Sequence, residues 1–79
     1  YPQLLINVPV TGKAAALLEV ESVRAAEAAS VARLGNRGRV LLRASGTEPL
    51  LRVMVESDDE VLTRHEAEFL AAQVRAACN

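Results

Sequence analysis

A ten-residue segment with the sequence RASGTEPLLR gathers polar side chains between two apolar runs. Arg43 and Arg52 stand at its ends, and each carries a planar, permanently charged guanidinium fork that suits phosphate oxygens. Between them, Ser45 and Thr47 each offer a hydroxyl and a backbone N–H, and Gly46 can adopt a positive φ that would turn successive N–H groups toward one point. These residue types predict an anion site, and phosphate is the anion that suits them best.

The flanking apolar runs are expected to bring the two arginines together. Residues 39–43 and 50–56 are typical of two strands in a hairpin, with Arg43 and Arg52 both near the loop. Because a strand residue rises only about 3.3 Å, both guanidinium groups could then reach one ligand. An exposed hairpin loop with two solvated arginines is the alternative interpretation. The segment is neither a P-loop nor a Rossmann fingerprint.

The pattern RxSGTEPxxR, which starts at Arg43, resembles the phosphate-binding loop of the α-D-phosphohexomutases. The continuation VMVE at residues 53–56 and the run PQLLINV at residues 2–8 are similar to the branch of that family that acts on glucosamine phosphates. The resemblance covers essentially the whole chain. Ala44 departs from it, since relatives often carry proline there, and this affects the stiffness of the loop more than its chemistry.

The resemblance implies the C-terminal domain, the fourth of four, of a larger enzyme. Such an enzyme interconverts glucosamine 6-phosphate and glucosamine 1-phosphate through a bisphosphorylated intermediate, on the route to UDP-N-acetylglucosamine and bacterial peptidoglycan. It uses a phosphoserine and a Mg²⁺ ion held by aspartates, all in earlier domains. The expected partners of this chain are therefore a phosphosugar and the other domains of the same protein. It would bind no metal, hold no catalytic residue and be inactive alone.

Within this chain, the resemblance assigns the loop to the phosphate that is not reacting. The arginines would neutralise and orient it, and the hydroxyls and N–H groups would donate to its oxygens. Glu48 is expected to turn away from the dianion, where it could pair with an arginine, and a direct role as a ligand is the alternative. The residues given this binding role are Arg43, Ser45, Gly46, Thr47 and Arg52.

Composition limits the other possibilities. The chain has 79 residues, of which 51% are hydrophobic and 24% charged, as expected for one small globular domain. A net charge of −1 predicts no general attraction to nucleic acid or to an anionic membrane. Cys78 is the single cysteine, which excludes an internal disulfide and fits a reducing cytoplasm. We expect neither Cys78 nor the single histidine, His65, to be catalytic or to bind a metal. A first residue of Tyr1, not Met, suggests a fragment of a longer protein.

The remaining chain predicts the elements that position the loop. Residues 3–10 are typical of a strand in which Pro9 favours an edge position or the end of the strand. Residues 14–34 favour helix, with a possible second segment capped by Ser22. Residues 60–77 predict a last helix, capped from the preceding Ser-Asp-Asp.

The side-chain pattern predicts which faces are buried. In the third strand, Leu51, Val53 and Val55 would face the helices, leaving Arg52, Met54 and Glu56 on an open face. In the long helical region, an imperfect apolar stripe comprises Leu17, Val20, Val23, Val31 and Leu34. The result is an α+β domain with an antiparallel sheet of three or four strands and two helices on one face. The resemblance adds a TATA-binding-protein-like topology.

A stand-alone α+β module that binds a protein or nucleic acid through its open sheet face is the rival interpretation. An RNA-binding sheet usually needs stacking aromatic side chains and a basic surface. Tyr1 and Phe69 do not form such a platform in the sequence. The composition therefore favours the phosphate-binding interpretation.

Overall fold

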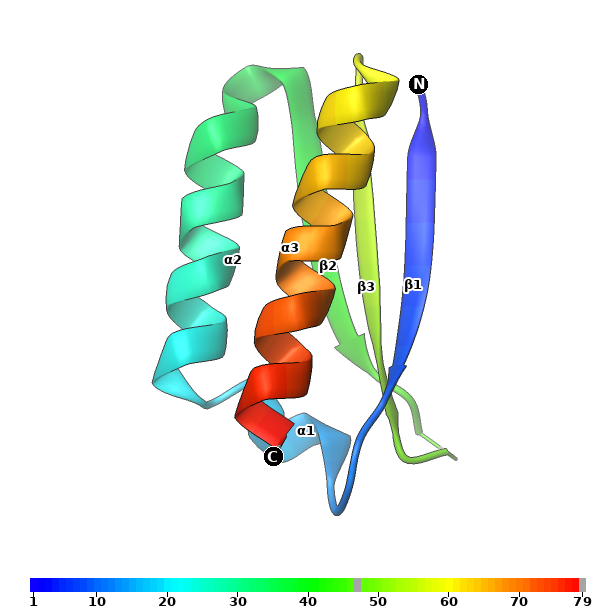
Figure 1. Ribbon diagram of the computed structural model, residues 1–79, viewed down its shortest axis with the longest axis vertical. Coiled ribbons are helices and arrows are strands. Elements are labelled where there is room, and N and C mark those ends of the chain that lie inside the picture. The colour runs from blue at the N-terminus through cyan, green and yellow to red at the C-terminus, as the bar shows by residue number, and fades with distance from the viewer. Residues whose placement is uncertain (47, 79) are drawn as a thin grey trace.

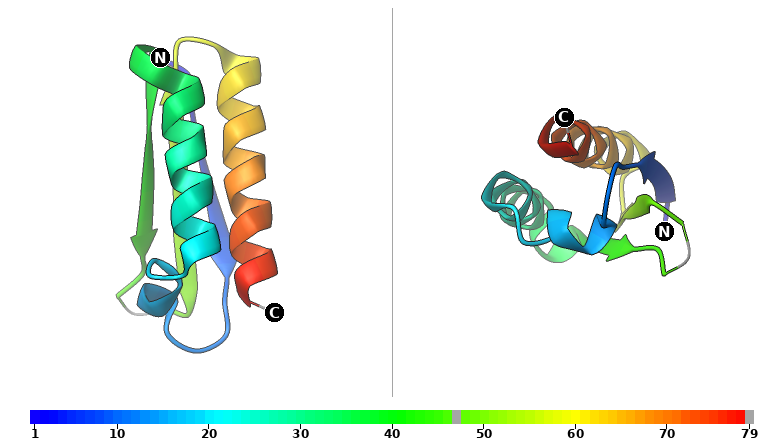
Figure 2. Two further views of the ribbon diagram at one scale, coloured as in Figure 1. Left: turned by 90° about the vertical axis from the view of Figure 1, so that its left-hand side faces the viewer. Right: turned by 90° about the horizontal axis from the view of Figure 1, so that it is seen from below.

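The computed structural model describes residues 1–46 and 48–78, in which two long helices cover one face of a three-stranded sheet (Figure 1). The predicted α+β class is therefore confirmed. Figure 2 shows the same arrangement from the side and from below, with α2 and α3 on one side of the strands. The elements are β1 (Gln3–Pro9), α1 (Ala14–Leu17), α2 (Glu21–Leu34), the 3₁₀ turn η1 (Gly35–Arg37), β2 (Gly38–Ala44), β3 (Leu50–Ser57) and α3 (Glu60–Cys78).

The central strand of the sheet is β3, which pairs antiparallel with β1 on one side and with β2 on the other. The first strand is therefore an edge strand, as Pro9 predicts, since proline has no N–H to donate to a neighbour. Three cross-strand rows lie on the face away from the helices. From the loop end of the β2–β3 hairpin they are Asn7–Arg52–Arg43, Leu5–Met54–Leu41 and Gln3–Glu56–Arg39.

The inward face of β3 forms the centre of the core. Leu51, Val53 and Val55 are fully buried, which confirms the predicted alternation along this strand. They belong to the same buried cluster as Leu70 and Val74 of α3. Because side chains alternate across a strand, burial of these three residues places Arg52 on the open face.

The predicted helical region is two helices, and one of its predicted details is wrong. Ser22 lies inside the first turn of α2, and the N-cap is Val20, which makes no side-chain cap hydrogen bond. The helix ends at Gly35 with a φ of 54°, a left-handed conformation that glycine adopts without steric cost.

The predicted stripe of this region is also shifted. Val31 is 50% exposed, whereas Ala26 and Ser30 are buried together with Val23 and Leu34. The helix therefore packs through small residues at its middle. Their size leaves room for a carboxylate that projects from α3, which local periodicity does not reveal.

That carboxylate belongs to Glu66, which is fully buried between the helices. The Ser30 hydroxyl donates to it at 2.6 Å, and two nitrogens of Arg33 donate to its two oxygens at 2.8 Å each. The Arg33 guanidinium also lies over the Phe69 ring, 4.6 Å from its centroid. These contacts supply the hydrogen bonds that a buried carboxylate requires, and they join α2 to α3.

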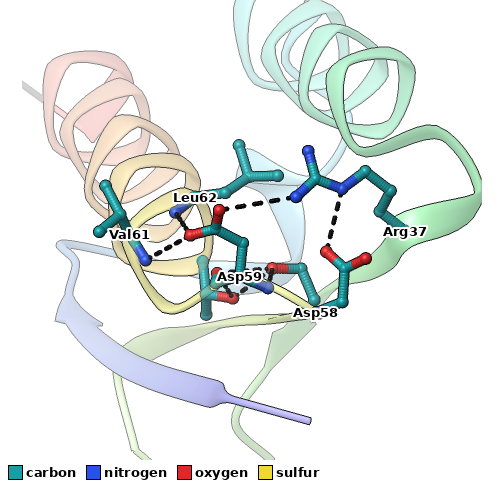
Figure 3. A network of polar contacts seen from close by, with 7 residues as sticks. Arg37, Asp58, Asp59, Val61 and Leu62 are labelled. Carbon is teal, nitrogen blue, oxygen red and sulfur yellow. Dashed lines mark hydrogen bonds and ion pairs between the residues drawn. The ribbon is translucent and has the colours of Figure 1, made fainter.

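Figure 3 shows how the preceding loop begins α3. The Asp59 carboxylate accepts hydrogen bonds from the N–H groups of Val61 at 2.8 Å and Leu62 at 3.1 Å, which confirms the predicted cap. Arg37 of η1 pairs with Asp58 at 2.9 Å and with Asp59 at 3.6 Å. The start of α3 is thereby tied to the turn that precedes β2. None of the described helices is long and apolar enough to cross a membrane.

We predict that Gly38→Ala destabilises the domain. A Cβ at this position would overlap the carbonyl oxygen of Glu56 and lie 2.7 Å from the Cβ of Ser57, because the two strands approach closely there. Overpacking of this kind costs about 1–3 kcal/mol, and each kcal/mol corresponds to about 4–8 °C in Tm for a domain of this size. Gly46→Ala is the control, since nothing lies within 4 Å of its Cβ position. Equal melting temperatures for both variants would contradict the close approach.

We also predict that Glu66 makes stability depend on pH. The hydrogen bonds from Arg33 hold the pKa of Glu66 below its ordinary value, and Ser30 adds to this effect while burial opposes it. A lowered folded pKa stabilises the domain above the unfolded glutamate value of about 4.3, and this stabilisation is lost as pH falls through the folded pKa. Glu66→Gln should therefore lower the free energy of unfolding by about 1–3 kcal/mol at neutral pH. The exposed Glu68 provides the control variant, Glu68→Gln.

Urea titrations from pH 7 to pH 3 would measure the free energy of unfolding of the unaltered chain, of Glu66→Gln and of Glu68→Gln. The difference in the free energy of unfolding between the unaltered chain and Glu66→Gln should narrow below about pH 4.3, where the glutamates of the unfolded chain take up protons. A difference that is constant across this range would show that the charge of Glu66 does not stabilise the fold.

Candidate anion-binding site

The register of the hairpin places two arginines side by side. Arg43 of β2 lies directly opposite Arg52 of β3, and both side chains are exposed on the open sheet face. Like charges directly opposite in a sheet are destabilising. Within residues 1–46 and 48–78, neither guanidinium has an ion pair or hydrogen bond, whereas Arg39 of the far row pairs with Glu56 at 3.0 Å. A bound anion would remove the repulsion that the protein leaves in place.

A hollow of about 300 Å³ lies between these arginines and the start of the loop. It has room for a phosphate group and is open to solvent. Its lining brings together four of the five residues predicted from the sequence, along with the intervening alanine. The lining residues that the structure describes are Arg43, Ala44, Ser45, Gly46 and Arg52. The fifth predicted residue, Thr47, lies outside the described residues.

Hydrogen bonds within the loop alter the role expected of Ser45. Its backbone N–H donates to the Leu50 carbonyl oxygen at 3.0 Å, and its hydroxyl oxygen accepts the Glu48 N–H at 3.3 Å. The N–H of Leu50 donates in turn to the carbonyl oxygen of Glu48 at 2.8 Å. In this structure the Ser45 N–H thus closes the loop and does not point to a ligand.

Gly46 also differs from its predicted conformation. Positive φ angles occur at Gly12 and Gly35 but not at Gly46, so the predicted reason for a glycine there is wrong. The residue is exposed, and a Cβ would meet no atom within 4 Å. Its lack of a side chain therefore leaves bare backbone at the mouth of the hollow, where a ligand can approach closely.

Within residues 1–46 and 48–78, Glu48 forms no ion pair with either guanidinium group. It lines a neighbouring hollow of about 340 Å³, together with Lys13, which precedes α1. It is not among the residues that line the hollow between the arginines. This position fits the expectation that its carboxylate turns away from a bound anion.

The described residues do not fit a Mg²⁺ site. They contain no cluster of three or more His, Cys, Asp or Glu side chains that could hold a metal. Asp58 and Asp59 are engaged by Arg37 and by the cap of α3. His65 is exposed, with its Nε2 4.0 Å from an oxygen of Glu66.

Cys78 is held more firmly than a thiol on a frayed helix end. The backbone N–H of Thr11 donates to its sulfur at 3.2 Å, and the Thr11 hydroxyl lies 3.5 Å from it. These hydrogen bonds hold the pKa of Cys78 below its ordinary value. The contact ties the end of α3 to the turn after β1, which is a structural role.

The fold is that of a small α+β domain whose open sheet face carries two neighbouring arginines with no partner among the described residues. Comparison with protein families places the chain more closely. Residues 5–73 match the model described as the phosphoglucomutase/phosphomannomutase C-terminal domain. The chain belongs to this family.

Individual relatives agree with the family match. The chain is 56% identical over 77 residues to phosphoglucosamine mutase 2 of Shewanella sp. (strain MR-4), and 54% identical over 76 residues to phosphoglucosamine mutase of Escherichia coli (strain K12 / DH10B). Each match covers 96% of this chain and 17% of the relative. The chain therefore spans about one sixth of the length of these relatives.

Solved structures show the same fold. The Aspergillus fumigatus N-acetylphosphoglucosamine mutase in complex with GlcNAc-6P and magnesium aligns with a TM-score of 0.77 at 28% identity, over 99% of this chain and 16% of that one. A variant of that enzyme in complex with glucose 1,6-bisphosphate aligns with a TM-score of 0.83 at 25% identity, also over 99% and 16%.

We predict that phosphate stabilises this chain through the two arginines. A ligand present at ten times its dissociation constant adds about 1.4 kcal/mol, or several degrees in Tm for a domain of this size. We expect a dissociation constant on the order of millimolar, because few contacts must offset the cost of ordering the ligand. Thermal unfolding in phosphate, compared with chloride at matched ionic strength, measures the gain.

The gain should disappear in Arg43→Ala and in Arg52→Ala. Arg39→Ala is the matched control, because Arg39 lies on the same face but is already paired with Glu56. Equal stabilisation of all four proteins would show that phosphate acts on the whole surface and not at this hollow.

Proposed function

We propose that this chain is the phosphate-binding C-terminal domain of a phosphoglucosamine mutase. The observation that carries the proposal is the pair Arg43 and Arg52, set opposite one another on the open face without a carboxylate partner among the described residues. A phosphate dianion supplies the two charges and the oxygen acceptors that two guanidinium forks need. The curated relatives named phosphoglucosamine mutase, 54–56% identical to this chain, support the choice of enzyme.

In this role the domain holds the phosphate of glucosamine 6-phosphate or glucosamine 1-phosphate that is not being transferred. The reaction would pass through a bisphosphorylated sugar that presents either phosphate to the same hollow. Long arginine side chains around an open hollow suit this task, because they can follow two orientations of the ligand. Thr47 would complete the binding set with Ser45 and Gly46.

The chemical steps would belong to other domains of the longer protein. A phosphoserine and a Mg²⁺ ion would act there, since the described residues of this chain do not fit a metal site. Those domains and the phosphosugar would be the partners of this chain. The enzyme would work in the bacterial cytoplasm and supply glucosamine 1-phosphate for the synthesis of UDP-N-acetylglucosamine and peptidoglycan.

The open sheet face supports the rival function less well. The nine residues of its three rows include no aromatic side chain on which a base could stack. Arginines occur in two of the three rows. In the row farthest from the loop, the charge of Arg39 is neutralised by its ion pair with Glu56. Only the row at the loop leaves its positive charge unbalanced, which favours a small anion over a long nucleic acid.

A chimera tests the proposed function. In E. coli phosphoglucosamine mutase, this chain would replace the matching 76-residue segment, with which it is 54% identical. The chimera should convert glucosamine 6-phosphate into glucosamine 1-phosphate, whereas this chain alone should not. Arg43→Ala or Arg52→Ala in the chimera should lower kcat/KM about ten- to a hundredfold, as expected for one charged hydrogen bond.

Lysine at either position should restore only part of the loss, because it lacks the planar fork. The control is Arg39→Ala, which should leave kcat/KM unchanged. If both alanine variants of the loop arginines keep full kcat/KM, the hollow does not hold the substrate phosphate.

A further inference from the structure

The row that contains the two arginines has a third member that the phosphate site does not use. Asn7 of β1 lies directly opposite Arg52, on the side away from Arg43. Neighbouring strands are about 4.8 Å apart, so Asn7 and Arg43 are separated by about 10 Å across the sheet. This juxtaposition arises only because β1 and β2 both pair with β3.

Asn7 is a polar residue in an otherwise apolar stretch of strand. Its neighbours in the chain, Ile6 and Val8, face the core, and the Asn7 side chain is exposed on the open face. Within the part of the chain that the structure describes, its amide makes no hydrogen bond. Among the described residues, no contact therefore accounts for an amide here, whereas Gln3, four residues earlier on the same face, donates to the sulfur of Met54.

The chemistry of the row changes from one end to the other. Guanidinium groups only donate hydrogen bonds, which matches a phosphate whose oxygens accept them. A side-chain amide both donates and accepts, which matches a hydroxyl group that does the same. Asn7 also does not line the hollow between the arginines. A ligand that places its phosphate in that hollow and extends across Arg52 would bring its uncharged hydroxyl-bearing part to Asn7.

We propose that Asn7 is a sugar-contacting residue that recognises a hydroxyl of the phosphosugar whose phosphate lies between Arg43 and Arg52. This inference rests on the proposed function, since it takes the phosphate position from it. Asn7 adds selectivity for a sugar phosphate over a simple phosphate ester of the same charge. It does not strengthen the binding of the phosphate group itself.

Two monoesters of equal charge separate these contributions. Methyl phosphate carries the phosphate without hydroxyls, and glucose 6-phosphate carries the same group on a sugar. Amide NMR titrations of the 79-residue chain with each ester give two dissociation constants. The chain should bind glucose 6-phosphate about three- to tenfold more tightly than methyl phosphate, the range expected for one neutral hydrogen bond.

Asn7→Leu keeps the approximate shape of the side chain and removes its hydrogen bonds. It should bind methyl phosphate as the unaltered chain does and lose the additional affinity for glucose 6-phosphate. Gln3→Leu is the matched control, because it removes an amide from the same strand and face in the row farthest from the arginines. It should keep the preference for the sugar phosphate.

The outcomes distinguish this inference from the function on which it rests. A chain that binds both esters and keeps its sugar preference in Asn7→Leu would overturn the role of Asn7 alone. A variant that remains folded but loses affinity for both esters equally would also overturn it, because Asn7 would then act on the phosphate. An unaltered chain that binds neither ester would overturn the proposed function, and this inference with it.

Discussion

Pairing of β3 on both edges is the constraint on which the rest of this domain depends. Its inward side chains, Leu51, Val53 and Val55, are completely buried under the helices. A slip of one residue would exchange them with Arg52, Met54 and Glu56 and bury two charges in the core. The register is therefore held by the hydrophobic effect, and it determines which side chains meet on the open face. The site is a consequence of core packing, although none of its charged groups belongs to the core.

The arginines on the two sides of the sheet have opposite surroundings. On the helical side, Arg33 is paired with Glu66, whose burial makes an unpaired charge costly. Arg33 itself is 43% exposed, so solvent screens part of that interaction. On the open side, Arg43 and Arg52 face each other without a carboxylate among the described residues. Water screens the repulsion between the two arginines and makes it tolerable. Because neither arginine is paired with a carboxylate, both can attract an anion.

The candidate site is exposed on this chain. The hollow is open to solvent, and the chain covers one sixth of the length of its relatives. Weak affinity in the isolated domain is then the physical expectation, because ions in water screen the two charges and few groups surround the ligand. Under the proposed function, other domains would close over the same phosphate and exclude the water. The sheet supplies a rigid base for that step, since its three strands hold the row in place.

Local signals in the sequence were sufficient for the strands, for the extent of the helices and for the meeting of the two arginines. Alternation along residues 50–56 predicted the two faces of β3, and the apolar runs around RASGTEPLLR predicted that Arg43 and Arg52 would meet at the end of a hairpin. Both depend on residues close together in the chain, where periodicity and turn chemistry act directly. The Asp59 cap was predictable for the same reason.

Other features arose only from contacts between distant parts of the chain. Glu66 interrupts an apolar helix face, and its partners Ser30 and Arg33 lie more than thirty residues away. Asn7 joins the arginine row only because β1 pairs with β3 and not with β2. Periodicity records whether a side chain faces a core, but it carries no information on which partner lies there. Strand order and helix packing supply that information, because they are selected by the burial of the whole core at once.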